Sequence, residues 1–321
     1  MTRALKVFFH DACFDGTASA ALFARFYRDA IAPAELALQP MQHSTGDPFA
    51  GVAIDGDDNA CVDFRFTADP RMRWWFDHHK TAFQPPALRA VFDGRAPVAT
   101  WFFDPDAPSC AGFVARVLHD RWGWTPPAHL AELVAWADTI DAARFASASD
   151  ATSLAHPAQQ LALWLGTAAR ADDVARYVNA LADGVDLAAA AAGFAKDGIA
   201  AATAARARHR EAIAGAARWH EDVVIVDMGD VPGAVAPGFL GYELFPACRY
   251  TASLVRTPRA VKIAIGWNPW GPPRRHDLGA LCERFGGGGH AAVGGVTLPP
   301  TELAHGRAAL AAIAEELAAA P

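Results

Sequence analysis

Arg73-Trp74-Trp75-Phe76-Asp77-His78-His79 is the stretch of the chain that decides the fold. Its apolar part, residues 73–76, has the length and composition of a buried β-strand and ends directly at one carboxylate and two imidazoles. Two similar apolar runs, residues 5–9 and 60–64, precede or carry further acidic and histidine residues. Open α/β sheets bind their ligands at the carboxyl ends of the strands, so we predict a functional site where these runs end.

Helices are predicted between and after these strands. Their ranges are 17–30, 109–122, 126–141, 161–166, 278–285 and 302–318, with a long connecting helix inside the alanine-rich segment 186–217. Strand-like runs lie at residues 222–228, 250–257 and 260–267. We therefore predict an α/β protein of two domains, with a parallel-sheet domain over residues 1–185, a helical connector over 186–219 and a smaller α/β domain over 220–321. The active site is expected in the cleft between the two domains.

Composition limits the class of protein. The 321 residues are 52% hydrophobic, which supports sizeable cores, and the formal net charge is −7. Proteins that coat long nucleic acid through overall charge are usually basic, so a long duplex is not expected as a partner. The five cysteines are scattered without a CxxC pair, which suits a reducing cytoplasm. Apolar runs are too short for a signal peptide or a membrane span, so we expect a cytoplasmic protein without membrane contact.

The triplet Asp77, His78 and His79 combines carboxylate oxygen with imidazole nitrogen, the donor atoms that suit Mn or a similar divalent metal. Water on such a metal becomes a nucleophile near neutral pH. The alternative is a polar loop that follows a strand. Further candidates stand near other predicted strand and helix ends: His10, Asp11, Asp15, Asp63, Asp138 and Asp141. Asp15 could be only a helix cap, but the joint occurrence of these residues favours a metal site.

The order of these motifs resembles that of the DHH phosphoesterases over nearly the whole chain. His10-Asp11-Ala12-Cys13-Phe14-Asp15-Gly16 corresponds to the first motif of that family, Val62-Asp63-Phe64 to the second and Asp77-His78-His79 to the third. Asp141-Ala142-Ala143-Arg144-Phe145 fits the fourth motif best, and Asp138 is its rival. Gly286-Gly287-Gly288-Gly289-His290 matches the glycine-rich signature of the DHH-associated second domain.

The resemblance implies a role for each candidate. Asp63 would bridge two metal ions, which in this family are usually Mn. The remaining metal ligands would be His10, Asp15, His78 and Asp141. Asp77, His78 and His79 would form the catalytic motif, in which Asp77 and His79 also position the imidazoles and polarise bound water.

One position departs from the family pattern. Typical members carry an aspartate two residues before Asp15, where this chain has Cys13. A thiolate is a softer ligand than a carboxylate and suits Mn poorly. Asp11 or His10 would compensate, or one metal position would be weak, or Cys13 would bind a different metal, so the expected count is one or two metals.

Substrate contacts are predicted in the second domain. Consecutive glycines expose backbone N–H groups to a phosphate, so Gly287, Gly288, Gly289 and the neighbouring His290 are candidate phosphate ligands, with a helix C-cap as the alternative. Residues 249–276 hold six basic and no acidic residues, which fits either a phosphate clamp or a solvated sheet face. Asn268 stands among aromatic residues that could stack on a base or pack in a loop.

The predicted function is hydrolysis of phosphoester bonds in short oligonucleotides or small nucleotides by metal-activated water. The resemblance also covers exonucleases of the RecJ type and exopolyphosphatases, so phosphoanhydride hydrolysis is an alternative. A second alternative is a catalytically impaired protein that binds a nucleotide or phosphate. The motifs of serine hydrolases, P-loop enzymes and dinucleotide dehydrogenases are absent from the sequence.

Overall fold

The computed structural model describes residues 2–42, 46–95, 100–167 and 169–319. The chain divides into two compact units. The first unit comprises Met1–Phe145 and Leu154–Thr203, and the second comprises Ala146–Ser153 and Ala204–Pro321. The chain therefore enters the second unit briefly, returns to the first, and enters the second again within a long helix, α9 (Lys196–Ala216).

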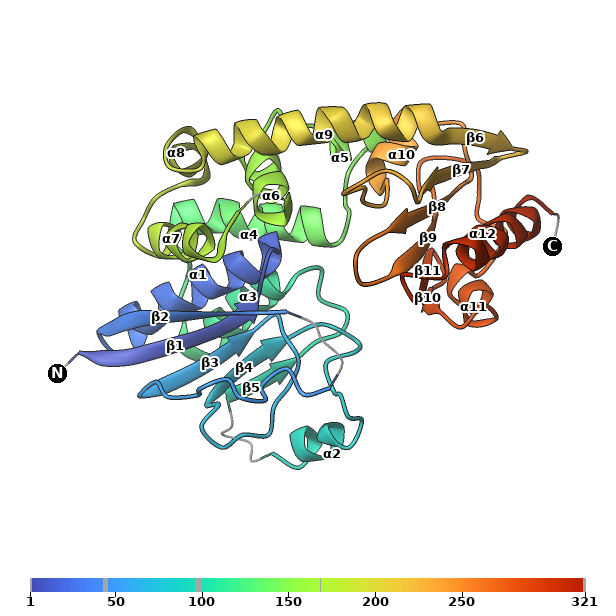
Figure 1. Ribbon diagram of the computed structural model, residues 1–321. Helices are drawn as coiled ribbons and strands as arrows, with labels where there is room; N and C mark the ends of the chain where they lie inside the picture. The colour runs from blue at the N-terminus through green and yellow to red at the C-terminus, as the bar shows by residue number, and fades with distance from the viewer. Residues whose placement is uncertain (1, 43–45, 96–99, 168, 320–321) are drawn as a thin grey trace. The chain divides into compact units, whose positions relative to one another are not determined.

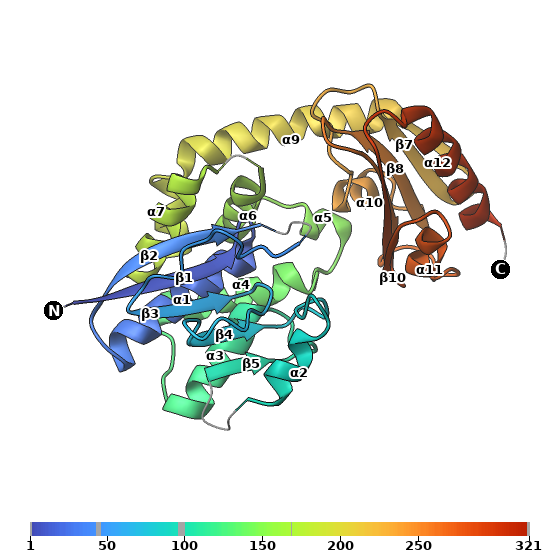
Figure 2. The same ribbon diagram turned by 60° about the horizontal axis from the view of Figure 1, so that its bottom comes forward.

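The first unit is built on a parallel sheet (Figures 1 and 2). Its strands, in spatial order, are β2 (Ala34–Met41), β1 (Arg3–His10), β3 (Asp58–Val62), β4 (Trp74–Asp77) and β5 (Thr100–Phe103). The three strands predicted from apolar runs are confirmed as β1, β3 and β4. The edge strands β2 and β5 were not predicted.

Both faces of this sheet are buried, as is usual for a parallel sheet. Successive side chains of a strand point to opposite faces, so each strand contributes to two cores. One core contains Val7, Phe9, Ala60, Val62, Trp74 and Phe76 together with the main helices. The other contains Phe8, Cys61 and Trp75 with Phe64, Phe66 and Phe92.

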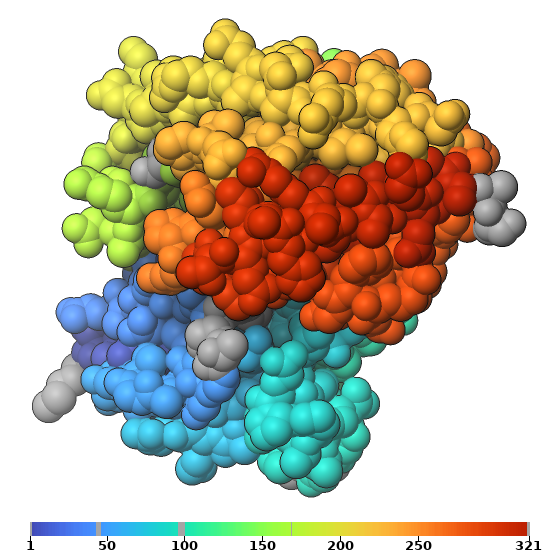
Figure 3. Space-filling view, turned by 45° about the vertical axis from the view of Figure 1, so that its right-hand side comes forward, coloured from blue at the N-terminus to red at the C-terminus, as the bar shows by residue number. Residues whose placement is uncertain are grey.

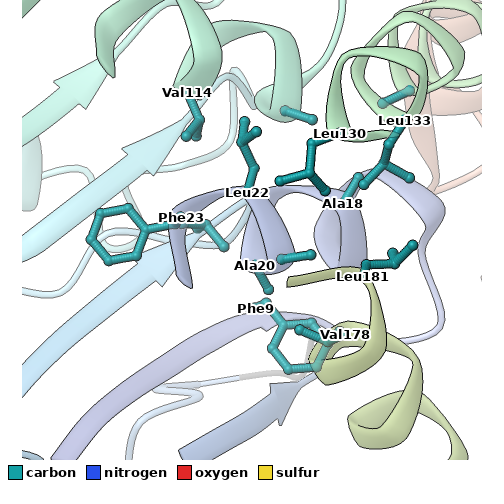
Figure 4. Close-up of a cluster of buried hydrophobic side chains, with 14 of the residues drawn as sticks. Phe9, Ala18, Ala20, Leu22, Phe23, Val114, Leu130, Leu133, Val178 and Leu181 are labelled. Carbon is teal, nitrogen blue, oxygen red and sulfur yellow. The ribbon is translucent and has the colours of Figure 1, made fainter. Parts of the chain in front are cut away.

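Helix α1 (Phe14–Ala30) is the centre of the first core, and Figure 4 shows its Ala18, Ala20, Leu22 and Phe23 among side chains from other elements. Small residues let the neighbouring elements approach α1 closely. The helices that pack on it are α3 (Cys110–Trp122), α4 (Ala128–Asp141), α6 (Pro157–Thr167) and α7 (Ala171–Ala182). The shorter helices of this unit are α2 (Leu88–Asp93) and α8 (Leu187–Ala192).

The strand order places a topological switch point beside β1. After β1 the chain crosses through α1 to β2 on one side, and then returns to β3 on the other side. Crossover connections that leave in opposite directions open a crevice at the carboxyl ends of the two strands, where open α/β sheets bind ligands. In this chain, the crevice position lies between the end of β1 at His10 and the end of β3 at Val62.

The second unit has a mixed sheet on which α12 packs, and the space-filling view of Figure 3 shows the dark red residues near the C-terminus at the surface. Its strands, in spatial order, are β10 (Gly288–His290), β11 (Val293–Leu298), β9 (Val261–Trp267), β8 (Tyr250–Arg256), β7 (Val223–Met228) and β6 (Ala217–His220). Its helices are α5 (Ala148–Ala151), α10 (Phe239–Leu244), α11 (Leu278–Glu283) and α12 (Leu303–Ala318). The predicted α/β class with a parallel sheet in the first part and a second α/β part is confirmed.

Within the described residues, no helix combines the length and the hydropathy that crossing a membrane requires.

Leu22 tests the role of α1 in the first core. Because its side chain is fully buried, Leu22→Ala is expected to lower the free energy of unfolding by about 2–5 kcal/mol. Urea denaturation followed by tryptophan fluorescence measures the change. Val91→Ala is the matched control, because Val91 is 45% exposed and its truncation should change stability by no more than about 0.5 kcal/mol. Equal losses in both variants would contradict the role assigned to α1.

Candidate metal centre

Three strands deliver polar side chains to the same sheet edge. His10 ends β1, Asp63 follows the last residue of β3, and Asp77 ends β4. Asp63 has a φ of 55°, a left-handed conformation that aspartate tolerates better than most residues. These residues therefore lie along the carboxyl-end edge of the sheet, at and beside the switch point between β1 and β3.

The Asp63 carboxylate is the least satisfied group at this edge. Its residue is 1% exposed, and among the described residues neither carboxylate oxygen accepts a hydrogen bond. The nearest donor atoms are His78 Nε2 at 3.5 Å, His10 Nδ1 at 3.6 Å and His79 Nδ1 at 3.7 Å. A buried charge in this state requires a counter-ion.

His78 faces several carboxylates with one ring nitrogen. Its Nδ1 donates to the carbonyl of Ala107 at 3.0 Å, because a carbonyl can only accept. Its Nε2 lies 3.5 Å from Asp141 and 3.6 Å from Asp15, in addition to Asp63. With the proton of the neutral ring fixed on Nδ1, Nε2 presents a lone pair to the carboxylates, which is the usual arrangement of a metal-binding histidine.

Asp15 is held by a helix other than its own. Its carboxylate accepts backbone N–H groups of Cys110 at 2.6 Å and Ala111 at 2.8 Å, the first residues of α3. The positive end of the α3 dipole thereby stabilises the negative charge. The alternative that Asp15 only caps its own helix is not what the structure has, because Cys13 is the N-cap of α1.

Gly16 makes the approach of α1 to β1 possible. A Cβ at this position would lie 2.2 Å from the carbonyl oxygen of His10. Any larger residue would separate the start of α1 from the end of β1. The glycine after Asp15 therefore keeps Asp15 and His10 in one site.

Asp141 and Asp138 lie in different surroundings. Asp141 groups with Asp15 and His78, and its side chain is 32% exposed. Asp138 instead accepts a hydrogen bond from the hydroxyl of Ser109 at 2.6 Å, next to the start of α3. Of the two candidates for the fourth motif, the structure brings only Asp141 to the other acidic residues.

Asp77 fixes the geometry of the triplet. It is fully buried, and its Oδ1 accepts the backbone N–H of His78 at 2.8 Å and the Nδ1 of His79 at 2.7 Å. The His79 side chain is 33% exposed. Asp77 therefore orients both histidines, and His79 is the one that reaches toward solvent.

The first loop contributes Cys13 as well as His10. The Cys13 sulfur groups with His10 and Asp63. Asp11 does not join any of these donor groups within the described residues. Its carboxylate accepts hydrogen bonds from the backbone of Ala12 and the side chain of Gln42. Of the two residues expected to compensate for Cys13, the structure brings His10 to the site.

Among the described residues, three overlapping groups of donors could hold metal ions, and in each group the ligand atoms lie within 4.8 Å of one another. The groups are His10–Cys13–Asp63, Asp63–His78–His79 and Asp15–His78–Asp141. Asp63 and His78 each belong to two groups, so the residues present fit one or two divalent cations. The orphaned oxygens of Asp63 and the orphaned Nε2 of His78 support this fit, since a cation would satisfy them.

The electrostatics of the metal-free site favour bound protons. Burial opposes the charge on His78, but the facing carboxylates of Asp63 and Asp15 and the carbonyl of Ala107 raise its pKa to about 10. Burial also opposes the charge on His79, and Asp77 outweighs it, which raises the pKa of His79 to about 9. Protonated histidines therefore supply the positive charge that a cation would otherwise supply.

The Cys13 thiol is affected by the same surroundings. Burial raises its pKa, and the carboxylates of Asp63 and Asp15 raise it further. The thiol of the metal-free protein is therefore protonated at neutral pH, and a cation would have to displace that proton to bind sulfur.

The predicted phosphate ligands form the edge of the second sheet. Gly288–His290 is strand β10, an edge strand of that sheet, and pairs with β11. A Cβ at Gly287 would lie 2.1 Å from the carbonyl oxygen of Gly295, and one at Gly289 would lie 2.3 Å from that of Val293. Gly288 has open space at its Cβ position, and His290 is exposed. Close backbone packing therefore explains two glycines of the run without any ligand.

Asn268 is buried, and its amide is already in use. Its Nδ2 donates to the carbonyls of Pro246 at 3.2 Å and Cys248 at 3.0 Å, and its Oδ1 accepts the backbone N–H of Trp270. These bonds hold a loop together. The basic segment is also partly neutralised, because Arg249 and Arg275 both bind Asp222.

Sequence comparison identifies no relative: no protein-family model matches the chain, and no curated protein matches it. Solved structures do match. A pGpG-specific phosphodiesterase, PggH from Vibrio cholerae, superposes with a TM-score of 0.69 at 19% identity, covering 97% of this chain and 98% of that chain. RecJ from Thermus thermophilus in complex with Mn²⁺ gives a TM-score of 0.62 at 15% identity, covering 98% of this chain but only 52% of RecJ. The DHH domain of a protein described as a ribosomal protein family member gives 0.56 at 13% identity, covering 99% and 88%.

This chain has the fold of the DHH phosphoesterases. The match extends over nearly its full length, so both units belong to the DHH arrangement of a parallel-sheet part and a smaller mixed-sheet part. The residues of the acidic motifs gather within the parallel-sheet unit of that fold.

The raised pKa values of His78 and His79 predict how the metal-free protein responds to pH. A histidine with a raised pKa in the folded state contributes stability that is complete below about pH 6.5 and is lost as the pH rises through its folded pKa. Thermal melting of chelator-treated protein should therefore shift downward between about pH 7 and pH 10.

His78→Asn should flatten this slope, whereas His305→Asn should leave it unchanged, because His305 is 65% exposed and distant in sequence from the site. A melting temperature that stays constant over this range in the parent chain would show that the histidines do not supply the counter-charge.

Proposed function

We propose that this chain is a metal-dependent phosphodiesterase that cleaves short oligonucleotides or small nucleotides. The observation that carries the proposal is Asp63, a buried carboxylate whose two oxygens accept no hydrogen bond from the described residues and which stands among three histidines. Burial of such a charge is costly, and a shared divalent cation is what offsets it in sites of this composition.

The residues that would hold the cations are those of the three donor groups. Asp63 would serve a position with His10 and Cys13 or one with His78 and His79, and Asp15, His78 and Asp141 would form a further position. When bound, divalent cations such as Mn²⁺ supply positive charge for the phosphoryl group and a water nucleophile near neutral pH.

The chain's own residues position the reacting groups. Asp77 locks the His79 ring through Nδ1, and its carboxylate raises the pKa of His79 and so favours the protonated ring. A protonated, partly exposed imidazole beside the metal site is placed to donate a hydrogen bond to a phosphate oxygen. The N–H groups at the α3 N-terminus meanwhile hold the Asp15 carboxylate in place, although burial and Asp63 raise the pKa of Asp15 overall.

In the second unit, we propose that β10 contributes to phosphate binding. Its outer edge has no strand partner in the described part of the chain, so backbone N–H groups on that edge can donate to an anion. The exposed His290 at its end can add a side-chain donor. Asn268 takes no part in this proposal, because its amide is bound within its own loop.

The substrate class rests on similarity and on charge. The neighbours in structure are named as a pGpG-specific phosphodiesterase, the exonuclease RecJ and an exopolyphosphatase-related protein. The pGpG-specific phosphodiesterase superposes on this chain with a TM-score of 0.69, and RecJ in complex with Mn²⁺ superposes with 0.62. Together with the net charge of −7, the similarity to the phosphodiesterase favours a small nucleotide or short oligonucleotide over a long strand.

Asp63→Asn tests the proposal directly. The substitution keeps the shape of the side chain but removes the charge that the cations need, so hydrolysis should fall more than about a hundredfold. The parent chain and the variant are assayed in Mn²⁺ with pGpG, a short oligoribonucleotide, single-stranded DNA and polyphosphate.

Asp93→Asn is the control, since Asp93 pairs on the surface with Arg89. Cleavage of polyphosphate alone would favour the exopolyphosphatase alternative. No cleavage of any substrate by the parent chain, with binding retained, would leave a catalytically impaired nucleotide-binding protein.

His290 tests the second unit. A hydrogen bond to a charged phosphate contributes about 1.5–3 kcal/mol, so His290→Ala should lower kcat/KM by about 10- to 100-fold without changing the melting temperature. His305→Ala is a control in the same unit, because His305 is exposed and contacts Glu302. Unchanged kinetics in His290→Ala would remove β10 from the binding site.

A further inference from the structure

The donor groups of the metal centre differ in chemistry. Asp15, His78 and Asp141 offer only oxygen and nitrogen atoms. His10, Cys13 and Asp63 offer nitrogen, sulfur and oxygen, again with all ligand atoms within 4.8 Å of one another. The second group is therefore the softer one.

Cys13 differs from the other cysteines of the chain. Cys61, Cys110, Cys248 and Cys282 are each fully buried and behave as small apolar residues. Cys13 is only partly buried, stands at the N-cap of α1 and directs its sulfur to a group of metal-binding side chains. Packing alone does not explain a thiol in this position.

Asp63 provides an observation that is independent of the cysteine. This carboxylate is 1% exposed, its two oxygens accept no hydrogen bond in the described part of the chain, and its Oδ2 lies 3.6 Å from His10 Nδ1. An orphaned buried carboxylate that faces an imidazole and a thiol indicates that a cation completes the group.

We propose that the His10–Cys13–Asp63 position takes a thiophilic divalent cation of the Zn²⁺ or Co²⁺ type, while the Asp15–His78–Asp141 position takes a harder cation such as Mn²⁺. A thiolate ligand selects softer metals, whereas carboxylates and imidazole accept Mn²⁺. The inference rests on the metal centre of the proposed function and specifies its cations: the centre binds two different metals.

Cobalt reports thiolate coordination without any assay of activity. Co²⁺ bound to sulfur absorbs in the near ultraviolet through a charge-transfer band. The metal-free full chain is titrated with Co²⁺ in the absence and presence of excess Mn²⁺. We expect the band to grow to one equivalent per chain, and to persist in Mn²⁺.

Cys13→Ser should abolish the band, and Cys13→Asp should replace it with a site that Mn²⁺ displaces at least about tenfold more easily. Cys248→Ser is the matched control, because Cys248 is a buried thiol of the second unit and should leave the band intact. Thermal melting of each variant checks that it is folded, and Cys13→Asp provides a folded comparison if Cys13→Ser is unstable.

A titration in which the parent chain shows no charge-transfer band, or shows a band that Cys13→Ser retains, overturns the inference. Metal analysis after equilibration with equal Zn²⁺ and Mn²⁺ gives the same decision: one zinc per chain that Cys13→Asp loses supports it, and two manganese ions in the parent chain overturn it. Phosphodiesterase activity without the band would refute the mixed-metal centre and keep the proposed function. The charge-transfer band without activity on any substrate would support the mixed-metal centre and refute the proposed function.

Discussion

The concentration of buried negative charge at one sheet edge is the constraint on which the rest of the structure depends. Asp15, Asp63 and Asp77 are each at most 1% exposed and gather beside Asp141 at the ends of β1, β3 and β4. Burial raises the pKa of a carboxyl group, and a neighbouring carboxylate raises it further. Burial and the charge of Asp63 both raise the pKa of Asp15 in this way. The fold tolerates these buried carboxylates only because positively charged or hydrogen-bond-donating groups face them.

Those groups come from three sources: the N-terminus of α3, the ring of His78 and bound cations. The N–H groups of α3 bind Asp15, which ties α3 to α1 across the sheet edge. The ring of His78 joins Asp15, Asp63 and Asp141, and its other nitrogen is anchored on the carbonyl of Ala107. Cations would be the third source. The candidate metal centre is therefore also a structural junction, and the side chains that would bind metal are held in position by the protein itself.

Much of the fold follows from local sequence, because β1, β3 and β4 are short apolar runs that end in polar residues. The strand β2 was missed since it lies at the sheet edge, is exposed at alternate positions and contains Pro40, which is a poor signal for a strand. Contacts between residues far apart in the sequence could not be predicted from local sequence patterns. Asp138 and Asp141 are about one helical turn apart, so local sequence does not distinguish them. The structure does, because Asp138 accepts a hydrogen bond from Ser109, which is 29 residues from it in the sequence.

Close backbone contacts at glycine have different consequences in the two units. Gly16 has no side chain, so α1 can reach the carbonyl of His10, and this contact brings residues of the candidate metal centre together. Gly287 and Gly289 let β10 lie against β11, which accounts for them by packing alone. Gly288 is not explained by packing, since no atom of the described residues lies within 4 Å of its Cβ position. Any part of the run that serves a phosphate is therefore to be sought at Gly288 and the exposed His290, where backbone and side chain are open to solvent.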